Sequence, residues 1–156
     1  MPLAPGPDEQ TGPADKRFCA FIARIIKDLS DPSQPPWRAV IVSHELAQPT
    51  AALDAVMEEL LQPRARYLNS IIRDVLGARA SKQAVSRMAF SVIAQCLFYL
   101  HNGEVIRRVY PELAQGRMNA REMAAHIAGF SLAALRTARR RLQSRSKTSK
   151  PAACMI

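Results

Sequence analysis

The sequence has few of the residues from which catalytic, metal or disulfide sites are built. Its 156 residues include only six glycines and three cysteines. Cys19, Cys96 and Cys154 are far apart and odd in number, which argues against a disulfide framework and against a zinc site. It also shows no Gly-rich phosphate-binding loop, no paired carboxylates with an assisting group for acid–base catalysis, and no Ser/His/Asp catalytic triad. We therefore expect neither an enzyme nor a protein with a metal or a cofactor.

Long apolar runs are also missing. AFSVIAQCLFYL, residues 89 to 100, is among the longest and falls short of the roughly 18 residues that a membrane span needs. The amino terminus has no signal-peptide pattern. With 48% hydrophobic and 22% charged residues, the composition is that of one soluble domain, which we expect in the cytoplasm without membrane contact.

Charge and proline divide the chain into three parts. Residues 1–13 are rich in Pro and Gly and predict a disordered leader. The net charge of +9 is concentrated in residues 136–150, so the folded part is far less basic. We expect one domain over residues 14–138 and a basic disordered tail over residues 139–156.

Apolar spacing within residues 14–138 predicts an all-α fold. Cys19 and Cys96 lie in such apolar patterns, so both are expected in the core. Helices are expected over residues 15–29, 37–47, 50–76, 82–101 and 119–138, with a short helix and turn broken at Pro111. Thr50, Ser81 and Asn119 are the expected N-terminal caps. The long third helix should bend in the turn before Pro63, because proline removes one backbone hydrogen bond and clashes with the Glu59 carbonyl.

The last two long helices favour a symmetric partner. Residues 82–101 are apolar on nearly every side, and small residues in the final helix permit close helix approach. An ordinary contact within one chain is the alternative reading. We expect a homodimer whose interface includes Met88, Val92, Ala125, Gly129 and Leu132.

Three sequence blocks resemble one known family. They are the HELAQPT…LD…QP stretch at residues 44–63, SVIAQCLFYLH at residues 91–101, and MAAHIAGFSLAALR at residues 123–136. Together they resemble the C-terminal domain of TetR-type regulators of the CerR-type branch, over roughly residues 15–138. The resemblance implies a helical bundle whose last two long helices form a dimeric four-helix bundle, with a small effector bound between the helices.

We do not expect the DNA-binding domain of that family before residue 15. The leader cannot form the three-helix DNA-binding domain that precedes this domain in TetR-type proteins. We therefore expect a gene fragment, a mis-called start or a stand-alone partner that forms a heterodimer with a complete TetR-type repressor.

Polar groups on otherwise apolar helices are the candidates for effector contacts. They are His44, Arg64, Tyr67, Gln95 and Tyr99, and the effector would be small and apolar or aromatic. Four of them have a simpler explanation. His44 would be a histidine bonded to a neighbour, Arg64 a solvated surface charge, and Tyr67 and Tyr99 core rings with exposed hydroxyls. His44 and Glu45 do not begin a zinc-protease motif, because Gln48 stands where the second histidine is required.

The leading functional hypothesis is a ligand-sensing, dimerising regulatory module without DNA-binding activity of its own. The alternative is non-specific nucleic-acid binding through the basic tail, whose cations would neutralise phosphates only weakly and without reading bases.

Overall fold

The computed structural model describes residues 11–31, 33, 40–41, 44–45, 47–114 and 119–148. Every regular element in these ranges is helical, which confirms the predicted all-α fold class. The elements are α2 (Ala14–Ser30), α4 (Ala52–Val56), the π-helix η1 (Met57–Leu61), α5 (Gln62–Leu76), α6 (Lys82–His101), α7 (Gly103–Val109), α8 (Pro111–Ala114) and α9 (Ala120–Thr148). Of the helix predicted over residues 37–47, the structure describes residues 40–41, 44–45 and 47, which are helical. Most of the leader lies outside the described residues.

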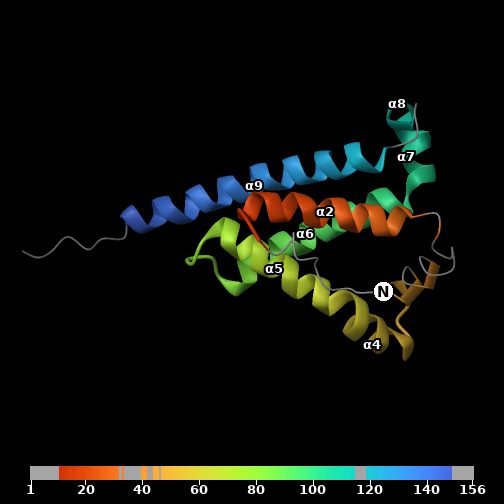
Figure 1. Cartoon of the computed structure of the whole chain (residues 1–156), viewed down its shortest axis with the longest axis horizontal. Coiled ribbons are helices and arrows are strands. Elements are labelled where there is room, and N and C mark those ends of the chain that lie inside the picture. Colours follow the sequence, from red (N-terminus) through yellow and green to blue (C-terminus); the bar gives the residue numbers. More distant parts are fainter. Residues whose placement is uncertain are drawn as a thin grey trace, which may run out of the picture.

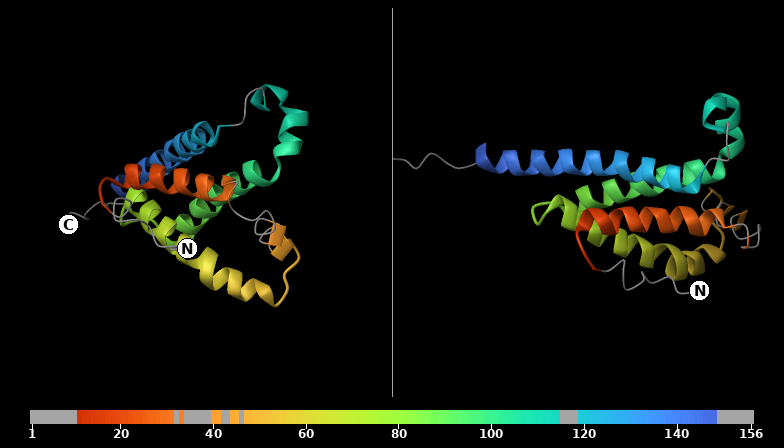
Figure 2. Two further views of the ribbon diagram at one scale, coloured as in Figure 1. Left: turned by 45° about the vertical axis from the view of Figure 1, so that its right-hand side comes forward. Right: turned by 45° about the horizontal axis from the view of Figure 1, so that its top comes forward.

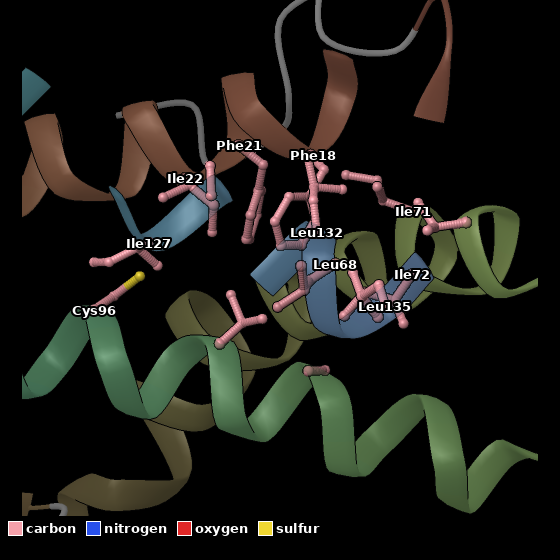
Figure 3. Close-up of a cluster of buried hydrophobic side chains, with 14 of the residues drawn as sticks. Phe18, Phe21, Ile22, Leu68, Ile71, Ile72, Cys96, Ile127, Leu132 and Leu135 are labelled. Atoms are coloured by element: carbon pink, nitrogen blue, oxygen red, sulfur yellow. The ribbon is translucent and has the colours of Figure 1, made fainter. Parts of the chain in front are cut away.

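Helix α2 is the central element of the bundle. It contacts α5, α6 and α9 (Figure 1). Phe18, Ile22 and Ile26 recur every fourth residue along it and are fully buried. They join one apolar cluster with residues of α5, α6 and α9, among them Leu68, Ile72, Cys96, Ile127 and Leu135 (Figure 3). Burying each such side chain stabilises the fold by about 1.5–3 kcal/mol.

Ion pairs along the α2–α5 contact show that these two helices are antiparallel. Arg17, near the start of α2, pairs with Asp74 near the end of α5 at 2.5 Å. Asp28, near the end of α2, pairs with Arg64 near the start of α5 at 3.3 Å. Partly exposed pairs contribute only up to about 1 kcal/mol each. The apolar cluster therefore holds the helices together, and the ion pairs fix their register.

The turn before Pro63, where a bend was predicted, is a π-helix. The five residues of η1 connect α4 to α5 in one nearly continuous helical path. Pro63 follows in the first turn of α5. Proline cannot donate the backbone hydrogen bond to the Glu59 carbonyl and would clash with it in a regular α-helix. A wider π turn relieves that clash, since such turns are a common way for a helix to absorb an irregularity.

Helix α6 begins directly after Ser81, its predicted N-terminal cap. The Ser81 hydroxyl accepts a hydrogen bond from the Ala84 backbone N–H at 3.1 Å. Gly77 ends α5 with φ of 88°, a conformation that favours glycine. Within the described ranges no single helix is long and apolar enough to span a membrane. The segments Lys82–Tyr99 and Gly103–Val109 reach that length and hydropathy only as a pair bent by 77°.

Helix α9 begins at its predicted cap but ends later than expected. The Asn119 side-chain oxygen accepts from the Arg121 backbone N–H at 2.9 Å. The helix then continues to Thr148 and extends past the other helices (Figure 2). The expected start of disorder at residue 139 is therefore wrong. Arginine is a good helix former, so a basic composition does not by itself end a helix.

The two cysteines within the described residues have different environments. Cys96 is fully buried in the core, as predicted, and burial raises the pKa of its thiol to about 11. Cys19 is exposed, which corrects the expectation of a core position. It follows Phe18 directly, and one residue turns a helix by about 100°, away from the Phe18–Ile22–Ile26 stripe.

Replacing Ser81 by Ala should destabilise the fold by roughly 1 kcal/mol, because the first turn of α6 would lose its side-chain acceptor. Urea unfolding at fixed protein concentration measures this loss. Ser144→Ala is the matched control, because that hydroxyl bonds only the Arg141 carbonyl on the exposed end of α9. Equal stability of the two variants would show that the cap does not contribute.

Candidate functional site

The outer sides of α6 and α9 expose apolar residues that the described part of the chain does not cover. Phe90 and Phe98 on α6 are 77% and 56% exposed, and Phe130 on α9 is 64% exposed. Ala94 lies between the two α6 phenylalanines, and Ala125 and Gly129 are exposed on α9. We call Phe90, Ala94, Phe98, Ala125, Gly129 and Phe130 the uncovered face. Three exposed phenylalanines on two adjoining helices are typical of an interaction surface.

Polar and aromatic contacts join α6 to α9 beside this face. The Gln95 amide donates to the Ser131 hydroxyl at 3.3 Å, and Ser131 is buried. The Tyr99 ring meets the His126 ring edge-on, with centroids 6.4 Å apart. His126 in turn lies 6.4 Å from Phe130. The seam between α6 and α9 therefore connects the core to the uncovered face.

The structure divides the predicted interface residues between two sides of the helices. Ala125 and Gly129 lie on the uncovered face, and Met88 is half-buried at the edge of the core. Val92 and Leu132 are buried in the chain's own core, so a partner cannot reach them in this fold. The prediction missed the three phenylalanines. Phe90 and Phe98 are eight residues apart on α6, but the pattern of a helix that is apolar on nearly every side does not show which side faces the core.

Two of the predicted effector residues lie between α2 and α5. The Tyr67 ring packs edge-on against Phe21, with centroids 5.8 Å apart. Arg64 pairs with Asp28 at the same contact. Both predicted residues are half-buried, which suits groups with an apolar stem and a polar tip.

The seam between α6 and α9 and the contact between α2 and α5, together called the two seams, both border the apolar core. Gln95 directly precedes Cys96 of α6, and Tyr67 directly precedes Leu68 of α5. Cys96 and Leu68 both belong to the apolar cluster that Figure 3 shows. The half-buried polar groups therefore lie at the edge of the apolar core, and polar groups beside an apolar wall are the side chains that small-molecule sites use.

His44 lies apart from these two seams. Its side chain is 56% exposed, with Nδ1 3.6 Å from the neighbouring Glu45 carboxylate. The Glu45 carboxylate accepts hydrogen bonds of 2.9 Å from both the backbone N–H and the hydroxyl of Thr50. These bonds lower the pKa of Glu45 below its usual value. Glu45 thus fixes the chain where it enters α4, and Thr50 also accepts from Ala52, the first residue of that helix, at 3.2 Å.

None of the five candidate effector residues lines the hollow of about 340 Å³ between α5 and α6, which Arg66, Arg73 and Lys82 surround with other residues. In the described part of the chain, no three His, Cys, Asp or Glu side chains are grouped as metal ligands. The site therefore consists of half-buried polar side chains beside the core, which suit ligand binding, and of exposed apolar side chains, which suit contact with another helix.

Comparison with known families identifies a regulator domain over most of the chain. Residues 14–135 match the family described as the HTH-type transcriptional dual regulator CecR, C-terminal domain. A comparison with curated proteins gave no match. The match begins with α2 and reaches Leu135 in α9, so it covers the apolar cluster, both seams and the uncovered face. Because the matched segment is most of the chain, the protein belongs to the family of CecR-type C-terminal domains, a regulatory domain of TetR-like transcription regulators.

Proposed function

We propose that the chain is the ligand-sensing and dimerising module of a TetR-like transcriptional repressor of the CerR-type branch, and that it acts by binding rather than by catalysis. Membership of a regulator domain family supports the regulatory role. The uncovered face is the observation that carries the proposal of a dimer.

Dimerisation would remove the exposed phenylalanines from water. Each buried aromatic side chain contributes about 1.5–3 kcal/mol, and a two-fold interface buries every contributing residue twice. Phe90 and Phe98 of one copy would meet the outer sides of α6 and α9 of the other as a four-helix bundle. Exposed Ala125 and Gly129 permit close approach of the two α9 helices. The matching face of a complete TetR-type repressor is a second possible partner.

Gly129→Arg should convert the dimer to a monomer, because a long charged side chain would project into the interface. A side chain at Gly129 meets nothing within 4 Å in its own chain. Arginine is also a better helix former than glycine, so the monomer should stay folded. Sedimentation at micromolar concentration measures the mass, and circular dichroism checks the helical content.

Gly129→Ala is the graded comparison for this substitution. A methyl group is uncharged and far smaller than the arginine side chain, so this variant should weaken the dimer much less. A monomeric unmodified chain, or a dimeric Gly129→Arg variant, would contradict the proposed interface.

A small apolar or aromatic effector would occupy the region that the two seams flank. Gln95 and Tyr99 would contact it from the α6–α9 side, and Tyr67 and Arg64 from the α2–α5 side. The support is their half-burial next to Cys96 and Leu68, together with the π-helix η1, which makes the start of α5 irregular. His44 would contribute as an exposed group near the entrance to α4.

Gln95→Leu should reduce the stabilisation that such effectors give, because the ligand would lose the amide. Thermal-shift screening with apolar and aromatic compounds finds the stabilisers, and each variant is compared with its own ligand-free melting temperature. That comparison is needed because the substitution also removes the hydrogen bond to buried Ser131. Gln83→Leu, at an exposed position of the same helix, should keep the full effect. Undiminished stabilisation of Gln95→Leu would remove Gln95 from the site.

Non-specific nucleic-acid binding through α9 is the second candidate function. Arg136, Arg139, Arg140 and Arg141 are all exposed on one helix, and within the described residues only Arg136 has an acidic partner, Asp15. A helix with closely spaced arginines can neutralise phosphates without reading bases. We propose that this contact is weak and that the chain itself selects no DNA sequence.

Replacing Arg139, Arg140 and Arg141 together by Gln should weaken DNA binding and reduce its dependence on salt. Each lost phosphate contact lowers the slope of log K against log salt by about 0.9. Fluorescence anisotropy with a random duplex at several salt concentrations measures the slope. Arg107→Gln with Arg108→Gln is the control, because Glu104 pairs with both arginines on α7. A sequence-specific complex that survives physiological salt would contradict the proposal.

A further inference from the structure

A hollow of about 340 Å³ lies on the outer side of the α5–α6 pair. One stripe of α5 and the first turns of α6 line it. The lining residues are Arg66, Asn69, Ser70, Arg73, Asp74, Lys82, Val85 and Ser86. Positions 66, 69, 70 and 73 follow helical spacing on one side of α5, as do positions 82, 85 and 86 on α6. The two stripes face each other because α5 and α6 pack as neighbours joined by a short turn.

Positive charge dominates this hollow. Arg66, Arg73 and Lys82 contribute three cations, and Asp74 contributes the single carboxylate among the lining residues. That carboxylate is engaged by Arg17 of α2 at 2.5 Å, which offsets its charge. Arg66 makes one long hydrogen bond to the neutral Gln62 side chain at 3.4 Å. The lining therefore keeps a positive charge that an anion would compensate.

The helix ends do not account for this potential. The hollow lies near the carboxyl end of α5, where the dipole is negative, and near the amino end of α6, where it is positive. These two partial charges oppose each other. The side-chain cations therefore set the sign of the field.

The hydroxyl groups make the chemistry more specific. The Ser70 hydroxyl already donates to the Tyr67 carbonyl at 2.7 Å, so it can offer a ligand only an acceptor. The Ser86 hydroxyl can donate or accept. A guanidinium donates two parallel hydrogen bonds to an oxyanion, and an ammonium adds a compact charge. The set fits a ligand with an oxyanion and at least one hydroxyl group.

We propose that the hollow binds the phosphate monoester of a small hydroxylated molecule. Arg66, Arg73 and Lys82 hold the phosphate oxygens, Ser86 donates to one of them, and Ser70 accepts from a ligand hydroxyl. A volume of about 340 Å³ is enough for a ligand of this size. The hollow shares no residue with the uncovered face or with the five candidate effector residues, so this site does not depend on the proposed dimer or effector.

NMR titration of the full chain with glycerol 3-phosphate and with inorganic phosphate, at fixed ionic strength, tests this site. We expect saturable shifts of the backbone amides over residues 66–73 and 82–86 with both probes. The ester should bind more tightly, because it alone carries the hydroxyl that Ser70 accepts.

Lys82→Gln and Arg73→Gln should each weaken ester binding roughly tenfold or more, since each removes a charge-assisted hydrogen bond. Arg87→Gln removes a cation from the same helix outside the lining and should leave the affinity nearly unchanged. Retained helical content in every variant separates loss of the site from loss of the fold.

Several outcomes would overturn the proposal. They are shifts that do not saturate with either probe, shifts centred on residues 139–141 instead of the hollow, and equal weakening by Arg87→Gln. A random DNA duplex that shifts the hollow amides while the ester does not would also overturn it, because the surface would then recognise a polyanion.

Discussion

The burial of α2 is the constraint on which the other contacts depend. Phe18, Ile22 and Ile26 are fully enclosed, and α5, α6 and α9 all pack against the helix that carries them. Three such side chains contribute on the order of the whole net stability of a small domain. Both seams follow from this burial, because Tyr67 reaches Phe21 only when α2 lies against α5, and Gln95 meets Ser131 only when α6 and α9 close over the cluster.

The described residues leave part of the apolar surface of α6 exposed. On α6, Val92 and Cys96 face the cluster, so Phe90 and Phe98 must point elsewhere. The described residues place no helix over them, and Phe130 on α9 is exposed as well. The hydrophobic effect therefore favours covering these rings with a second surface, which the dimer proposed above would supply.

Local signals in the sequence predicted much of the fold. Ser81 and Asn119 cap the helices that they were expected to cap, and Pro63 follows an irregular turn. Each of these depends on a few neighbouring residues. The orientation of Phe90 relative to Val92 depends instead on where α2 and α9 lie, which no local pattern contains. The hollow was also not predicted, because Arg73 and Lys82 are brought together by the α5–α6 turn rather than by one sequence motif.

Gly129 gives an argument for a partner that does not depend on the exposed rings. Glycine in a helix interior costs about 1 kcal/mol relative to alanine. Such a residue usually has a reason in packing, such as a neighbouring helix too close for a side chain. Among the described residues of this chain the reason is missing, because a Cβ atom at position 129 would meet nothing within 4 Å. Nor does the backbone require glycine, since position 129 lies inside α9 and is not among the residues with positive φ. A close contact with a second molecule supplies that reason, and Gly129 lies beside Phe130 on the face where such a contact would form.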